Sequence, residues 1–201
     1  MDGCMNNRKA TATTVKGKAR KIRLLLTDVD GVLTDTGVYY SEAGEVLKRF
    51  SIRDGMGVER LRQIVNVETG IITGERSASI KKRADKLQIA ELHLGIKEKA
   101  QALEEIMVRT SLGRDQIAYI GDDMNDLEVI KTVGLSACPG DSFPAIKKIA
   151  DFICIARGGQ GAFREFAEFI ISAQLNGKKT AAIKQKKGGN LNEANQEGAS
   201  Q

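Results

Sequence analysis

Two aspartates separated by one residue, Asp28 and Asp30, follow a short apolar run that is typical of a buried strand. Gly31 then interrupts the run. In an open α/β sheet, ligands bind at the carboxyl ends of the strands, and two carboxylates there are costly unless a cation lies beside them. Mg²⁺ suits such a place because proteins bind it through one or two carboxylates, phosphate oxygens and water. Alternatively, both aspartates could simply lie in a solvated turn.

Three more groups of residues that could take part in catalysis or binding follow predicted strands later in the chain. They are a hydroxyl, a lysine and an acidic group: Thr73, Lys99, and Asp122, Asp123 and Asp126. Together with the first two aspartates, they supply the nucleophile, metal ligands, hydrogen-bond donor and cation that hold a phosphoryl group.

Each of these groups also has a structural interpretation. Thr73 could begin a helix, Lys99 could be a solvated helix lysine, and the acidic group could be a capping turn. Their common order and their placement at strand ends favour the chemical interpretation.

The elements that must position these residues alternate between strand and helix. Strands are predicted at residues 22–27, 69–72, 91–94, 117–120, 135–137 and 152–155, and helices at 55–64, 77–87, 97–108, 125–132, after Pro144, and at 162–173. Two β-prone runs around a Gly-containing turn, residues 37–50, predict a hairpin. The alternation predicts an α/β fold with a doubly wound parallel sheet and crossovers on both faces. The domain is expected over residues 21–175, between a disordered basic extension (1–20) and a disordered polar tail (176–201).

Composition excludes several function classes. The net charge is +5, but residues 1–21 hold six basic residues against one acid and residues 176–201 hold five against two. The body between them is mildly acidic, so the basic excess is typical of solvated tails rather than of a nucleic-acid surface. Aromatic residues make up 4% of the chain and Trp is absent, which argues against a base-stacking platform. We therefore expect no nucleic-acid partner.

The same inventory bears on metals and location. The only histidine is His93, and the three cysteines show no metal-ligand spacing, so zinc and His-based catalysis are disfavoured and a reducing compartment is indicated. No apolar run reaches membrane-spanning length, so we expect no membrane partner and a cytoplasmic location. The N-terminal segment is basic and Thr-rich, and an organelle transit peptide is an alternative interpretation of it.

The motif residues resemble the haloacid dehalogenase superfamily of phosphotransferases. Asp28–Gly31 matches that family's Asp-x-Asp-Gly motif, Thr73 its second motif, Lys99 its lysine, and residues 121–126 its Gly-Asp-Asp motif with a later Asp. The resemblance covers about residues 21–173 and implies a Mg²⁺-dependent phosphatase. It also implies the Rossmann-like fold of that family.

The resemblance assigns a role to each motif residue. Asp28 would be the nucleophile that becomes phosphorylated, and Asp30 the general acid and base. Mg²⁺ would be held by Asp28, the backbone carbonyl of Asp30, and Asp122. Asp123 would orient metal-bound water, and Asp126 would brace the loop. Thr73 and Lys99 would bind the phosphoryl oxygens. Lys97 competes with Lys99 for the last role.

Nothing in the chain is long enough to be the inserted cap domain that usually selects the substrate in this superfamily. Capless members resembling this chain, the 3-deoxy-octulosonate 8-phosphate phosphatases, form tetramers in which a neighbour covers the open site. Their substrate is a sugar-acid phosphate, and Arg53 could pair with its carboxylate or with an acid at a subunit contact. The stretch around Arg53 resembles the eight-carbon enzymes, and the resemblance implies 3-deoxy-D-manno-octulosonate 8-phosphate as the expected substrate. Glu75 after Thr-Gly, with Lys86 one helix later, resembles relatives that act on nine-carbon nonulosonate 9-phosphates.

Two functions of another class stay open at this point. Phospho-acceptor signalling modules also place paired acids, a threonine and a lysine around Mg²⁺, but they carry the acceptor aspartate after the third strand. Here the third strand end, near Leu94, has no aspartate. A catalytically silent scaffold with the same fold is the other alternative, and the presence of every motif residue argues against it.

Overall fold

The computed structural model describes residues 12–178. Within them, six parallel strands form one sheet in the order β5-β4-β1-β6-β7-β8. Their bounds are β1 Leu24–Thr27, β4 Glu68–Thr73, β5 Glu91–Leu94, β6 Ile117–Ile120, β7 Leu135–Cys138 and β8 Phe152–Ile153. The predicted doubly wound parallel sheet is confirmed. From β1, the chain adds β4 and β5 on one side of the sheet and then β6, β7 and β8 on the other side. The point where the strand order changes direction therefore lies beside β1.

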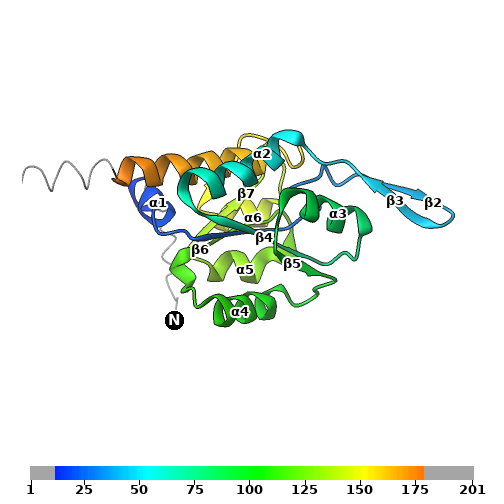
Figure 1. Cartoon of the computed structure of the whole chain (residues 1–201), viewed down its shortest axis with the longest axis horizontal. Coiled ribbons are helices and arrows are strands. Elements are labelled where there is room, and N and C mark those ends of the chain that lie inside the picture. Colours follow the sequence, from blue (N-terminus) through cyan, green and yellow to red (C-terminus); the bar gives the residue numbers. More distant parts are fainter. Residues whose placement is uncertain (1–11, 179–201) are drawn as a thin grey trace, which may run out of the picture.

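Helices cover both faces of the sheet (Figure 1). They are α1 Ala12–Ala19, α2 Ile52–Arg60, α3 Ala78–Leu87, α4 Lys99–Thr110, α5 Leu127–Thr132, α6 Pro144–Ile149 and a C-terminal helix over residues 162–178. Successive strand residues point to opposite faces. Leu25 accordingly packs in the core under α2, α3 and the C-terminal helix. Leu24 and Leu26 pack in the core under α4, α5 and α6.

The helical spacing in the sequence predicts a buried stripe of Met56, Val58, Leu61 and Ile64, and the buried face of α2 differs from it. Val58 and Leu61 are buried as expected, but Met56 is 42% exposed and Ile64 is 36% exposed. The contact face includes Gly57, where an added Cβ would lie 3.1 Å from the Phe163 ring, so a large residue is not needed on that side. The last turn, Leu61–Val65, is a π-helix, which shifts the periodicity around Ile64.

The predicted disordered extension over residues 1–20 is corrected for residues 12–19, which form α1. Tertiary contacts account for this helix, because Val15 and Ala19 are buried in the core and Lys18 Nζ lies 2.6 Å from Asp151 Oδ1. Residues 176–178, assigned to the polar tail, continue the C-terminal helix. Residues 1–11 and 179–201 lie outside the described part of the chain.

The predicted hairpin is confirmed. Strands β2 (Val38–Ser41) and β3 (Gly44–Lys48) pair antiparallel and project from the body of the molecule (Figure 1). Within residues 12–178 this hairpin is the only insertion beside the site, and no cap domain is present. None of the helices in this range has the length and apolar character needed to cross a bilayer.

Candidate active site

A cavity of about 370 Å³ opens at the carboxyl ends of β1, β4 and β6. This is the place where the strand order reverses and where open α/β sheets bind ligands. It is lined by Asp28, Asp30, Thr36, Thr73, Gly74, Glu75, Asp122, Asp123, Met124 and Asn125. Most of the residues that the sequence singled out therefore meet in one space, although they lie far apart along the chain.

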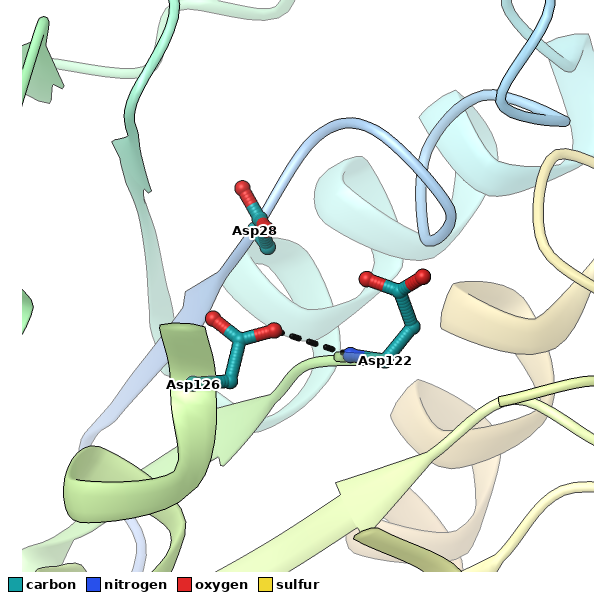
Figure 2. A group of neighbouring side chains, drawn as sticks. All are labelled: Asp28, Asp122 and Asp126. Atoms are coloured by element: carbon teal, nitrogen blue, oxygen red, sulfur yellow. Dashed lines mark hydrogen bonds between the residues drawn. The ribbon is translucent and has the colours of Figure 1, made fainter. Parts of the chain in front are cut away.

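Three carboxylates converge at the floor of this cavity. Asp28 follows β1, Asp122 follows β6, and Asp126 lies on the short helical turn after it (Figure 2). One oxygen from each lies within 4.8 Å of the others. Burial and the neighbouring carboxylate of Asp126 raise the pKa of Asp28. Burial, with Asp28, Asp126 and Asp123 nearby, raises the pKa of Asp122 to about 8. The cluster therefore carries more negative charge than its surroundings compensate.

Lys99 lies beneath this cluster, in the first turn of α4. Its Nζ lies 2.7 Å from Asp28 Oδ2 and 2.7 Å from Asp126 Oδ1, and its side chain is 1% exposed. Burial alone would lower the pKa of Lys99, but the two carboxylates outweigh it and hold the pKa above its usual value. The competing Lys97 is exposed. The structure thus brings Lys99, and not Lys97, into contact with Asp28.

The Asp126 carboxylate is already satisfied by protein donors. Oδ1 accepts hydrogen bonds from Lys99 and from the Tyr119 hydroxyl at 2.5 Å. Oδ2 accepts from the Asp122 amide at 2.9 Å (Figure 2). Tyr119 is a fully buried β6 residue. The sequence did not identify it as a site residue, because a tyrosine within an apolar strand is expected to belong to the hydrophobic core. The available signal was its hydroxyl, which needs a partner when buried.

Each oxygen of Asp126 accepts from two protein donors, whereas each oxygen of Asp28 has one partner, the Val29 amide or Lys99. Asp28 and Asp122 therefore keep lone pairs for a divalent cation. Gly31, with φ of 83°, brings the turn after β1 so close to Asp122 that an added Cβ would overlap the Asp122 carboxylate. The turn that carries the Asp30 carbonyl and the Asp122 side chain therefore lie against each other. A set of carboxylate and carbonyl oxygens with uncompensated charge fits a hard divalent ion.

Asp30 lines the cavity and is held from the hairpin. Its Oδ1 accepts a hydrogen bond from Lys48 Nζ at 2.7 Å and from the Thr34 hydroxyl at 3.2 Å. Burial alone would lower the pKa of Lys48, but the carboxylates of Asp30, Glu45 and Glu75 raise it above its usual value. Sequence reasoning missed Lys48, since its burial depends on how the hairpin folds back.

Thr73 ends β4 and is buried, with its hydroxyl accepting from the Glu75 amide at 3.3 Å. Glu75 lines the cavity. Arg53 and Lys86 are exposed and do not line this cavity of the single chain. Lys86 lies in the last turn of α3, about 12 Å along the helix axis from the helix start.

A glycine-rich segment supports the turn that carries Asp30. The Gly159 amide donates to the Val32 carbonyl at 2.9 Å, and a Cβ on Gly158 would overlap the Gly31 carbonyl oxygen. Asp54, buried in α2, accepts hydrogen bonds from the Gly161 amide at 3.2 Å and the Arg164 amide at 2.9 Å. The segment before the C-terminal helix is thereby fixed against both α2 and the turn that carries Asp30.

Comparisons with known proteins agree with this geometry. Residues 64–161 match the family described as haloacid dehalogenase-like hydrolase. The 3-deoxy-D-manno-octulosonate 8-phosphate phosphatase of Salmonella typhi is 38% identical over 163 residues, which span 81% of this chain and 86% of that protein. The chain belongs to the haloacid dehalogenase-like hydrolases.

Solved structures of this hydrolase family superpose on most of the chain. The phosphatase of the same name from Yersinia pestis matches with a TM-score of 0.77 and 38% identity, covering 80% of this chain and 86% of that one. The one from Moraxella catarrhalis, solved in complex with magnesium ion, phosphate ion and a KDO molecule, matches with a TM-score of 0.79 and 33% identity, covering 86% and 98%. The described part of this chain, which has no cap domain, therefore shares its fold with these two phosphatases over most of its length.

Proposed function

We propose that this hydrolase is a Mg²⁺-dependent phosphomonoesterase acting on 3-deoxy-D-manno-octulosonate 8-phosphate. One observation carries the proposal: at the strand-order switch point, the Asp28 carboxylate contacts Lys99 and lies within 4.8 Å of the Asp122 carboxylate. The relatives named for this activity, and the Moraxella structure with its magnesium, phosphate and sugar-acid ligands, support the substrate and the metal.

The proposed reaction has two steps, in which Asp28 carries the phosphoryl group and Asp30 transfers the protons. Asp28 attacks phosphorus and forms an aspartyl phosphate, while Asp30 gives a proton to the departing ester oxygen. Asp30 then takes a proton from water, which attacks the phosphorus and frees Asp28. Thr73 and Lys99 donate hydrogen bonds to the phosphoryl oxygens as negative charge moves onto them.

The Mg²⁺ ligands in this proposal are the carboxylates of Asp28 and Asp122 and the backbone carbonyl of Asp30. These residues would hold the ion, which would supply positive charge that neutralises the phosphoryl oxygens. Asp123, at the cavity wall, orients metal-bound water. Asp126 braces the loop through its bond to the Asp122 amide.

A nine-carbon nonulosonate 9-phosphate is the second candidate substrate. The observation that favours it is Glu75, which lines the cavity near Thr73 and would face the sugar. Lys86 and Arg53 would contribute only from a neighbouring subunit or after a rearrangement, because both lie outside the cavity of one chain.

We also propose a cytoplasmic homotetramer without nucleic-acid or membrane partners, built on one catalytic domain (residues 21–175) extended by α1. Apolar side chains on the hairpin support a subunit contact: Tyr39, Tyr40, Val46 and Leu47 are 58%, 72%, 54% and 47% exposed. A neighbour docked there would help to cover the open cavity. Light scattering of the purified protein measures the number of subunits.

Phosphate release from eight- and nine-carbon sugar-acid phosphates, measured with and without Mg²⁺, tests the proposed function. We expect the highest kcat/KM for the eight-carbon substrate and loss of turnover in Asp28→Asn. The matched control is Asp35→Asn in the same loop, which removes the half-buried partner of the exposed Arg49 side chain and should keep activity. An active Asp28→Asn variant refutes the mechanism. Stoichiometric phosphorylation without turnover indicates a phospho-acceptor module, and no release from any substrate indicates a scaffold.

A further inference from the structure

Lys48 is a buried lysine that the reaction described above does not use. It ends β3 of the hairpin, and its side chain is 1% exposed. Lysine is almost never fully buried unless it is paired. Its Nζ lies 2.7 Å from Asp30 Oδ1 and 3.7 Å from Glu45 Oε2. A surface hairpin thus directs its one buried cation at the proposed general acid.

The contacts of Lys48 continue to the phosphate side of the cavity. Glu45, its second partner, accepts a hydrogen bond from the Ser77 hydroxyl, and Ser77 caps the N-terminus of α3 by accepting from the Ile80 amide. This helix follows directly on the loop that begins at Thr73. The hairpin therefore connects the turn bearing Asp30 with the segment bearing Thr73 through one continuous set of polar contacts.

The two oxygens of Asp30 have unequal surroundings as a result. Oδ1 accepts from both Lys48 and the Thr34 hydroxyl, whereas no protein donor to Oδ2 is found among the described residues. The Asp30 side chain is 28% exposed and lines the cavity. Because two donors occupy Oδ1, Oδ2 is the oxygen of Asp30 left for a reacting group in the cavity.

We propose that Lys48 is a positioning residue for acid–base catalysis: from the hairpin it fixes Oδ1 of Asp30 and thereby presents Oδ2 to the leaving group. This inference rests on the proposed phosphatase function. In the first step, the proton on Oδ2 moves to the ester oxygen as the phosphorus–oxygen bond breaks and the Asp28–phosphorus bond forms. In the second step, Oδ2 takes a proton from the attacking water.

The dependence of the rate on the leaving group tests this role. An alkyl phosphate needs a proton on its departing oxygen, whereas p-nitrophenyl phosphate releases p-nitrophenolate, which departs readily as an anion without one. kcat/KM reports only the steps up to transfer of the phosphoryl group to Asp28, so it isolates the acid step. For Lys48→Met we expect kcat/KM to fall about 100-fold with the sugar-acid phosphate, the lower end of a general acid's contribution, and less than about 3-fold with p-nitrophenyl phosphate.

Three further variants separate positioning from a structural role. Lys48→Arg should restore part of the alkyl phosphate activity, because it keeps a cation near Oδ1. Asp30→Asn/Lys48→Met should be no worse than Asp30→Asn alone, since both act through one carboxyl group. Lys97→Met, at an exposed lysine, should leave both substrates unaffected. An equal fall with both substrates, or independent losses in the double variant, overturns the role of Lys48 while wild-type turnover upholds the proposed function. An inactive wild type refutes the proposed function itself.

Discussion

Replacing Lys99 with Met should destabilise the metal-free protein far more than any surface lysine would. Lys99→Met keeps the length and apolar stem of the side chain but removes the charge that lies 2.7 Å from both Asp28 and Asp126. At an effective dielectric constant of 20, each contact corresponds to a gross attraction of about 6 kcal/mol. Desolvation of the buried charges offsets much of this. Removal of one partner from a buried pair typically costs about 3–5 kcal/mol, which is the loss that we expect.

Urea unfolding at pH 7.5 in EDTA measures this loss. Lys97→Met, two positions earlier and exposed, is the matched control and should change the free energy of unfolding by less than about 0.5 kcal/mol. The loss in Lys99→Met should shrink toward pH 5, because protonation of the stranded carboxylates relieves their repulsion. The catalytic readout should follow the same order, with kcat/KM reduced about 100-fold or more in Lys99→Met only. If the free energy of unfolding of Lys99→Met lay within about 1 kcal/mol of the wild-type value at pH 7.5, the buried ion pairs of Lys99 with Asp28 and Asp126 would be refuted.

Two other perturbations test the carboxylates proposed to bind Mg²⁺ and the glycine-rich segment that supports the turn at Asp30. In the folded metal-free protein the pKa of Asp122 is raised to about 8 and that of Asp28 is also raised. The stability that they contribute is therefore complete below about pH 4 and is lost as pH rises toward 8. Because Mg²⁺ requires ionised ligands, its addition should raise Tm more at pH 8 than at pH 6; equal gains in scanning fluorimetry contradict this. Gly158→Ala should displace the turn at Gly31 and lower kcat at least 10-fold, with near-normal far-UV circular dichroism; unchanged kcat contradicts the contact.

The sheet and the placement of most of the candidate site could be predicted from sequence because both depend on local patterns. Short apolar runs separated by helix-length segments specify a parallel sheet. Residues that directly follow such runs must meet at one edge. Asp28, Thr73 and Asp122 could therefore be brought together before their distances were known.

The parts that could not be predicted depend on long-range packing. Helix α1 has little amphipathic pattern, and its stability comes from the burial of Val15 and from the ion pair between Lys18 and Asp151. The burial of Lys48 depends on how the hairpin folds against the turn at Asp30. Nothing in a linear pattern distinguishes that lysine from its solvated neighbours.

The glycine segment before the C-terminal helix also bears on how the chain gains activity during synthesis. Gly158 and Gly159 contact the turn that carries Asp30, yet the ribosome makes them long after that turn has emerged. A nascent chain that extends just past Asp126 holds every motif carboxylate but lacks this support. Catalytic competence should therefore arise late, when the final helix leaves the exit tunnel, and premature termination before residue 158 should yield an inert product.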